Sequence, residues 1–322
     1  MRKTLLSAVL FAGGLGLTGS LPAFAADIRL DRSILQSVVS VLPVLDDEEQ
    51  ANRQGNPEGS GTVVFEGGYI ATNFHVLGRA ETARVRTHDG RVLDARIIGR
   101  DGATDIALLK VEADLPVPAF RLEAPALTET VCAVGNAFGF DLSVTCGVVS
   151  AVHRTGTGFN PMEDFIQTDA AANPGNSGGG LFDREGRLVG MVSAIFADAS
   201  DMNVGVNFAT STRLLLRITG DQKDDGRVSR GVSGLRVGPL SRAQRVKTNG
   251  VAVKRILDRG GAQASGLREG DIITQIEDRL IRQGSDVTSV FSLHRPGDVL
   301  TIRYLRGGEA ATARLQLGAP RG

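Results

Sequence analysis

The 322-residue chain has few of the residues that build metal centres and disulfide scaffolds. It contains two cysteines, Cys132 and Cys146, and four histidines. Two cysteines with no pair of histidines close to them cannot complete a structural zinc site, so we expect no metal ion. The segment between the cysteines has the composition of a turn joining two β-like runs, so they could face each other across a hairpin. We predict a disulfide between them; two buried thiols are the alternative.

Long apolar runs are also missing, except at the start of the chain. Residues 1–25 begin with basic residues, continue with an apolar stretch and end in Ala-Phe-Ala, which is the layout of a secretory signal peptide. An uncleaved membrane anchor is the alternative, but the apolar stretch is short for a membrane span. No later segment is apolar enough to cross a bilayer. We therefore expect an exported protein, in a compartment where a disulfide can persist.

The chain has no net charge, because 36 basic residues balance 36 acidic ones, but the charges are unevenly placed. Residues 27–227 contain 18 basic and 28 acidic residues, whereas residues 229–322 contain 16 basic and 8 acidic ones. Such asymmetry indicates two domains with different partners, or electrostatic docking of one domain on the other. Charges that are merely solvated at the surface are the alternative. An exported chain of this kind is not expected to bind nucleic acid.

Short β-branched runs punctuated by glycine fill residues 38–209, a pattern typical of an all-β sandwich or barrel. A proline-containing stretch at 112–127 interrupts these runs and suits a crossover between two sub-barrels. Residues 211–218 have helical spacing, and residues 219–227 have the composition of a polar linker. A second compact pattern follows, so we expect a second domain.

One glycine-rich stretch, ANPGNSGGG at 172–180, surrounds a serine, Ser177. A serine hydroxyl is a poor nucleophile unless a base removes its proton and a third group orients that base. His75 follows a predicted strand end, where a side chain can emerge into a cleft. His88 lies in a hairpin signal and His294 in a predicted polar helix, and we predict both at the surface. Its position suits a base, but His153 stays open as well, and on composition alone any one of the four histidines would more often be structural than catalytic.

Two acids, Asp101 and Asp105, are candidates to orient the histidine. Asp105 directly precedes a predicted strand at 106–111, whereas Asp101 lies in a loop. A rigid element fixes a side chain better than a loop does, so Asp105 is preferred. Around the serine, the backbone N–H groups of Gly175 and Ser177 are the candidate donors to an oxyanion, since so tight a loop needs residues without a Cβ restriction.

Three stretches resemble the trypsin-like proteases of the HtrA (Deg) family: TNFHV at 72–76, TDIALLKV at 104–111 and DAAANPGNSGG at 169–179. They occur in the order His, Asp, Ser, and the resemblance extends from about residue 37 through the C-terminal module. It implies a mainly β fold class, with a chymotrypsin-like double β-barrel protease domain followed by one α+β PDZ domain. The implied bounds are a signal peptide at 1–25, the protease domain at 27–218, a linker at 219–228 and the PDZ domain at 229–318. The implied catalytic residues are His75, Asp105 and Ser177, with an oxyanion hole from Gly175 and Ser177.

The resemblance also implies where a substrate would lie. The segment GMVSAI at 190–195 resembles the strand whose backbone pairs with the substrate in this fold, and it would place Ser193 near Asp105. Specificity for arginine or lysine needs an acid six residues before the nucleophile, but this chain has Ala171 there, so we expect apolar side chains to be accepted. The expected pocket residues are Ala171, Ala172, Val192, Ser193, Ala194, Ile195 and Phe208.

The second module resembles a PDZ domain of the HtrA type at RGVSGL (230–235), GVAVK (250–254) and GAQASGLREGDII (261–273). Such a domain adds a peptide strand beside its own and holds the terminal carboxylate with backbone N–H groups. A helix from residue 285 to about residue 294 would form the other wall of the groove. The implied peptide-binding residues are Val232, Ser233, Gly234 and Leu235.

Taken together, the resemblance implies an ATP-independent serine endopeptidase of the periplasm. It would cleave misfolded or exposed polypeptides through an acyl-enzyme, for protein quality control, and bind peptide C-termini at its PDZ domain. The family also implies a homotrimer or a larger assembly built of trimers, and no cofactor. A peptide-binding chaperone and a regulatory, site-specific protease with an inactive resting state are the alternatives.

Overall fold

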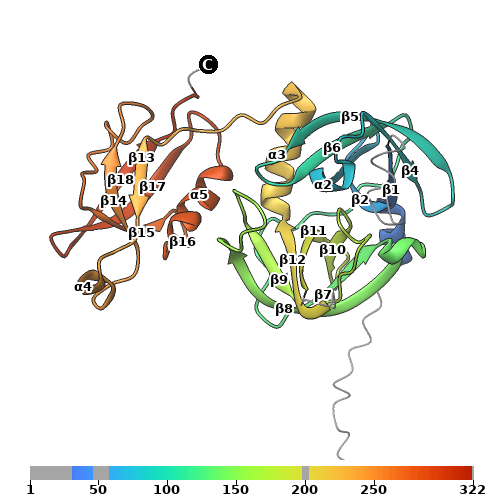
Figure 1. Cartoon of the computed structure of the whole chain (residues 1–322), viewed down its shortest axis with the longest axis horizontal. Helices are drawn as coiled ribbons and strands as arrows, with labels where there is room; N and C mark the ends of the chain where they lie inside the picture. The colour runs from blue at the N-terminus through green and yellow to red at the C-terminus, as the bar shows by residue number, and fades with distance from the viewer. Residues whose placement is uncertain (1–30, 46–57, 198–202, 321–322) are drawn as a thin grey trace, which may run out of the picture.

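The computed structural model describes residues 31–45, 58–197 and 203–320. Within these ranges the chain forms two closed barrels, followed by a separate C-terminal domain built on one antiparallel sheet (Figure 1). The mainly β, double-barrel prediction is therefore confirmed. The signal peptide predicted for 1–25 lies outside the described residues. None of the helices in the described ranges is long and apolar enough to span a membrane.

The first barrel has the strand order β1-β2-β3-β6-β5-β4. In strand β4 inward and outward side chains alternate: Ala83 and Val85 are buried in the barrel, while Thr82 and Arg84 are exposed to solvent. Its centre is filled by apolar side chains such as Val63, Ile70 and Leu109. The elements are η1 (Arg32–Ser37), β1 (Val38–Val44), β2 (Gly59–Phe65), β3 (Tyr69–Asn73), α2 (Phe74–Leu77), β4 (Thr82–Arg86), β5 (Val92–Asp101) and β6 (Ile106–Val111).

The second barrel has the order β10-β11-β12-β9-β8-β7, and the predicted crossover at 112–127 lies between β6 and β7. Cys132 of β7 is paired directly with Cys146 of β8, and the two form a disulfide, which confirms the predicted bond. The elements are β7 (Thr130–Gly135), η2 (Ala137–Gly139), β8 (Ser143–Arg154), β9 (Phe165–Thr168), β10 (Gly180–Asp183), β11 (Leu188–Ala197) and β12 (Asn203–Ser211).

Apolar side chains from both barrels meet in one cluster, against which helix α3 (Thr212–Asp225) packs with Leu214, Leu215 and Ile218. The cluster fixes one barrel relative to the other. Residues from different barrels that line a cleft between them therefore keep fixed positions relative to one another.

The end of α3 differs from the prediction. We expected the helix to end at residue 218 and a linker to follow, but the helix continues to Asp225 and ends at Gly226, which adopts φ +69°. The added turns contain polar residues that are buried because each finds a partner. Gln222, for example, donates through Nε2 to the carbonyl of Ile106 at 3.2 Å. Most of the predicted linker is therefore helix.

The C-terminal domain has its own core and a sheet of order β13-β14-β15-β17-β18, with β16 paired to β15. Strand β13 lies at the edge of the sheet, beside the start of helix α5, where Val237 approaches Gly284. The elements are β13 (Leu235–Gly238), α4 (Arg242–Arg245), β14 (Val251–Ile256), β15 (Ile272–Ile276), β16 (Arg279–Leu280), α5 (Gly284–Ser292), β17 (Val299–Arg306) and β18 (Glu309–Gln316).

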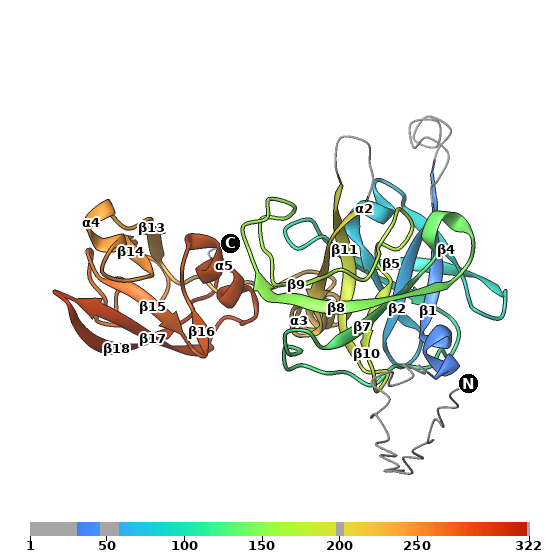
Figure 2. The same cartoon turned by 90° about the horizontal axis from the view of Figure 1, so that it is seen from below.

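This domain contacts the barrels with α5, β16 and the segment after α5 (Figure 2). Leu293 packs against the cluster between the barrels, and Arg295 donates to Asp221 of α3 at 2.8 Å. Between them, His294 has a side chain only 18% exposed. The prediction that His294 lies at the surface is thus wrong, because docking of the domain covers it, whereas His88 is exposed as predicted.

Candidate active site

His75 and Asp105 are brought together by two neighbouring strands of the first barrel. His75 lies in α2, directly after β3, and Asp105 directly precedes β6, which pairs with β3. The His75 Nδ1 atom lies 2.7 Å from Asp105 Oδ2, and the His75 backbone N–H donates to Oδ1 at 2.9 Å. The other candidate acid, Asp101, instead accepts from Thr104 and from Arg230 of the C-terminal domain.

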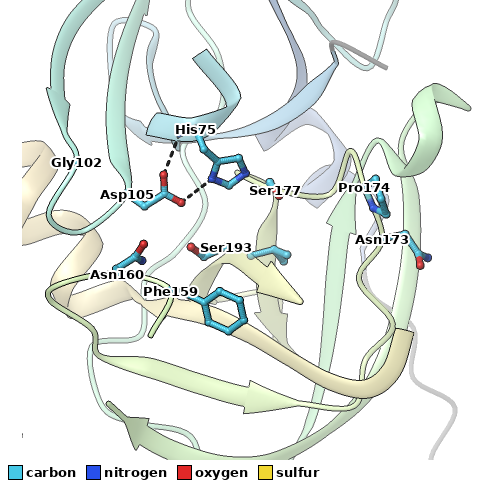
Figure 3. A pocket seen from close by; sticks show the side chains of 10 residues that line it. His75, Gly102, Asp105, Phe159, Asn160, Asn173, Pro174, Ser177 and Ser193 are labelled. Atoms are coloured by element: carbon cyan, nitrogen blue, oxygen red, sulfur yellow. Dashed lines mark hydrogen bonds and ion pairs between the residues drawn. The ribbon is translucent and has the colours of Figure 1, made fainter. Parts of the chain in front are cut away.

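Ser177 reaches the same place from the loop between β9 and β10. The Ser177 carbonyl accepts from the Ser60 N–H at 2.8 Å, and the next N–H, of Gly178, donates to Val192 at 2.8 Å. These bonds tie the loop to both barrels. In Figure 3, Asp105 and Ser177 lie on opposite sides of the His75 ring. Among the described residues, Ser177 has no hydrogen bond to His75, so the structure contains the His75–Asp105 link alone.

Position 175 requires a glycine. Its φ is +99°, and a Cβ at this position would lie 2.2 Å from the Asn136 carbonyl oxygen. The Phe138 N–H donates to the Pro174 carbonyl at 2.8 Å, which directs the N–H of the same peptide, that of Gly175, the opposite way. In the described ranges the N–H groups of Gly175 and Ser177 have no hydrogen-bond partner.

A cavity of about 520 Å³ opens at the side chains of His75, Asp105 and Ser177 (Figure 3). Of the predicted pocket residues, Val192 and Ser193 line it. Ala171 is exposed outside it, Ala172 is buried in the core of the second barrel, and Phe208 is buried behind the wall. Ala194 and Ile195 pair with Phe208 and Asn207 across β11 and β12, but their side chains are outside the described part of the structure.

Sequence reasoning missed several lining residues, of which Phe159 is the largest. Its ring packs against that of Phe208 at a centroid distance of 5.7 Å, and Phe208 in turn packs against Phe165 at 5.6 Å. A lone aromatic residue in the glycine-rich stretch TGTGFN (155–160) is the signal that could have pointed to it. The other missed lining residues are Gly102, Asn160, Asn173 and Pro174.

A further missed residue, Asn73, links two predicted ones. Its Nδ2 atom lies 3.0 Å from Asp105 Oδ2 and 3.1 Å from Ser193 Oγ. Ser193 is therefore near Asp105, as predicted, but the two are linked through the side-chain amide of Asn73.

In the C-terminal domain, three of the predicted peptide-binding residues directly precede edge strand β13, and the fourth, Leu235, is its first residue. Gly234 adopts φ +78°, and its carbonyl accepts from Leu257 at 2.8 Å. Val232 is paired with Gly318, and the hydroxyl of Ser233 accepts from the N–H of Leu235 at 3.1 Å.

The fold and the site together define a trypsin-like double barrel with a histidine, an aspartate and a serine in one cleft, followed by a second domain built on one antiparallel sheet. Family models agree: residues 59–191 match the trypsin-like peptidase domain, and residues 231–317 match the PDZ domain. The chain belongs to the HtrA family.

The relatives include the probable periplasmic serine endoprotease DegP-like of Halomonas elongata, 35% identical over 81% of this chain and 56% of the relative. Periplasmic serine endoprotease DegP of Escherichia coli strain K12 is 33% identical over 80% of this chain and 56% of that protein. The chain thus spans a little over half the length of these curated relatives. Among solved structures, the HtrA-type protease AlgW with tripeptide matches at 32% identity with a TM-score of 0.69, over 89% of this chain and 95% of that one.

Proposed function

We propose that this protein is an ATP-independent serine endopeptidase of the periplasm that cleaves misfolded or exposed polypeptides for protein quality control. The observation that carries the proposal is the convergence of His75, Asp105 and Ser177 on one cavity, with His75 Nδ1 held at 2.7 Å by Asp105. This contact leaves the other ring nitrogen, Nε2, to act as the base. The periplasmic names of the relatives and the secretory pattern of residues 1–25 support the location.

The chemistry follows from these positions. His75 takes the proton of the Ser177 hydroxyl while Oγ attacks the carbonyl carbon of the substrate. The carbonyl oxygen becomes an anion that the N–H groups of Gly175 and Ser177 stabilise. The C–N bond then breaks, the leaving amine takes the proton from His75, and the acyl group stays on Oγ. Water, deprotonated by His75, releases the acid and restores the serine.

The cavity favours apolar substrate side chains. Phe159, Val192 and Pro174 supply apolar surface, and Asp105, which is bound to His75, is the one acid among the described lining residues. A cationic substrate side chain would therefore find no free carboxylate there. We propose cleavage after apolar residues.

The C-terminal domain is proposed to bind peptide C-termini. Strand β13 is an unpaired edge, so a peptide strand can add beside it, and Val232, Ser233, Gly234 and Leu235 would receive the carboxylate. A neighbour in the solved structures, AlgW, is described with a tripeptide and with a decapeptide, which supports peptide binding in this architecture. We also propose a homotrimer or a larger trimer-based assembly, which the family implies.

Digestion of unfolded casein, followed by mass spectrometry of the peptides, tests the proposal. Ser177→Ala should lower the rate by at least about 10³-fold. Ser150→Ala, which changes an exposed serine on β8, is the matched control and should retain the wild-type rate. Many different peptides would indicate quality control, while one site-specific product would indicate a regulatory protease. Casein degradation that persists in Ser177→Ala would contradict the proposed activity.

A further inference from the structure

Asn73 is a wholly buried amide at the end of β3, two residues before His75, with 0% of its surface exposed. Its Nδ2 atom faces three oxygens: the Asp105 carbonyl at 2.9 Å, Asp105 Oδ2 at 3.0 Å and Ser193 Oγ at 3.1 Å. A carbonyl and a carboxylate only accept hydrogen bonds, so the NH₂ end of the amide must point toward them. The orientation of Asn73 is thus fixed by its surroundings.

Asp105 needs such a partner because its backbone is strained. Its φ is +58°, in the left-handed region that a residue with a Cβ rarely adopts. The Asp105 carbonyl accepts from the Phe74 N–H at 3.1 Å and from Asn73, so two donors hold the strained peptide. The same Asn73 amide also reaches the carboxylate. One side chain therefore fixes both the backbone and the side chain of Asp105.

The other end of the amide shows that this arrangement is not simply the most stable one. Within the described residues, Asn73 Oδ1 is buried and has no hydrogen-bond partner. A buried polar atom without a partner costs free energy that an apolar side chain would avoid. An asparagine at this position is thus better explained by what its NH₂ group does for Asp105 and Ser193.

We propose that Asn73 is a positioning residue for the reaction proposed above, on which this inference rests. Its amide holds Asp105 so that Oδ2 faces His75 Nδ1, and it ties that carboxylate to Ser193 on the strand that lines the cavity. Removing it frees the Asp105 carboxylate to turn away from the histidine. The loss should fall on the chemical step and leave substrate binding nearly unchanged.

The reaction of Ser177 with a fluorophosphonate probe measures this directly, since the probe reacts with an activated serine. In Asn73→Ala we expect the labelling rate to fall about 10- to 100-fold. Asn73→Asp keeps the shape of the side chain but replaces the NH₂ donor by an acid. Its labelling rate should fall by a similar factor, and the half-maximal pH of labelling should move upward. For cleavage of a peptide taken from the main casein site, kcat should fall while KM stays within about twofold.

The matched control is Thr219→Val. Thr219 is also wholly buried, and its hydroxyl donates to a backbone carbonyl, that of Leu215 at 2.7 Å, but both residues belong to α3 and neither lines the cavity. It should lose stability as Asn73→Ala does and still label within about twofold of the wild type. Wild-type labelling rate and wild-type pH profile in both Asn73 variants would overturn the proposal.

A second readout does not depend on activity. In the Ser177→Ala variant, the proton between His75 and Asp105 should give a proton NMR signal downfield of the amide signals. The signal should be absent from His75→Gln. Adding Asn73→Ala to Ser177→Ala should shift or remove it. An unchanged signal would overturn the inference. If the wild type fails to label at Ser177 but the signal still responds to Asn73, the protease proposal fails and the positioning role stands.

Discussion

Asp164 of the double barrel and Arg279 of the PDZ domain form an ion pair, with an N···O distance of 2.7 Å, although they are 115 residues apart in sequence. Asp164 is buried, and it also accepts from His153 at 3.1 Å and from the Ser211 hydroxyl at 2.7 Å. Burial alone would raise the pKa of the Asp164 carboxyl, but the hydrogen bond from His153 and the charge of Arg279 outweigh it and hold the pKa far below its usual range. The carboxylate is therefore a charged anchor for the PDZ domain.

Two further pairs have the same polarity. Arg230 of the PDZ domain binds Asp101 at 2.5 Å, and Arg295 binds Asp221 at 2.8 Å. In each of the three, the acid comes from the acidic part of the chain and the arginine from the basic part. Of the readings of the charge asymmetry, electrostatic docking of one domain on the other is the one this geometry supports.

Arg279→Ala should therefore destabilise the docked arrangement. Because it leaves a buried carboxylate without its cation, we expect a loss of about 3–5 kcal/mol, measured by urea unfolding. Limited proteolysis should also become faster at the segment joining the domains. The control is Arg282→Ala, since Arg282 is a nearby exposed arginine without an ion pair among the described residues. It should change neither the free energy of unfolding nor the rate of proteolysis. Equal stability of the two variants would contradict a role for the pair in docking.

Mild acid should weaken the same interface through His294. Burial and the charge of Arg213 lower the pKa of His294, more than Asp298 raises it. The folded protein then binds fewer protons here than the unfolded chain, whose histidine has a pKa of about 6.5. The contribution of neutral His294 to the free energy of unfolding is therefore complete above that pH. It is lost as the pH drops through this value toward the lower folded-state pKa. The melting temperature of the wild type should decline more between pH 7.5 and 5.5 than that of His294→Gln, with exposed His88→Gln as the control.

The disulfide should contribute to the second barrel. Cys132 and Cys146 close a loop with a sequence separation of 14, and a cross-link over such a loop stabilises by about 3 kcal/mol. Replacing both by alanine should lower the free energy of unfolding in urea by about that amount. Wild type treated with a reductant is the internal control, because it loses the bond and keeps both side chains otherwise unchanged. Superimposable curves with and without the bond would show that it adds nothing.

Phe159 should influence which bonds are cut. Its side chain lines the active-site cavity and is 40% exposed, and its ring rests on buried Phe208. Phe159→Ala widens the cavity, so cleavage sites in casein should shift toward bulkier apolar residues before the cut. Phe140→Ala, which truncates a phenylalanine that is 87% exposed and does not line the cavity, should leave the pattern as in the wild type. Identical cleavage maps for wild type and Phe159→Ala would refute this assignment.

How much could be predicted from the sequence depended on whether a feature is local. His75 and Asp105 lie next to the strands that fix them. Ser177 lies in a loop that sterically requires glycines. Short sequence motifs were therefore enough to predict all three residues. Gly175 illustrates the steric reason, since no Cβ fits beside Asn136. Each of these three residues is thus marked by a motif in its own stretch of the sequence.

Features that depend on distant partners were not predictable in this way. Asn73 meets Ser193 across 120 residues, and Phe159 takes its place from its packing on Phe208. The end of α3 was misjudged for the same reason, because a polar residue such as Gln222 is expected in a linker until its buried partner is known. Ala172 was placed in the pocket by its position in a motif, whereas its packing against distant residues buries it in the core of the second barrel.

The most direct measurement is the site of covalent modification by diisopropyl fluorophosphate, read by intact-mass analysis and peptide mapping. It should be made with a free apolar C-terminal peptide present to occupy the PDZ domain. We expect one phosphoryl adduct per chain, on Ser177, and its loss in His75→Ala and in denatured protein. Cleavage of casein by a protein that carries no adduct at Ser177, or an adduct on another serine that abolishes cleavage, would contradict the assignment of Ser177 as the nucleophile.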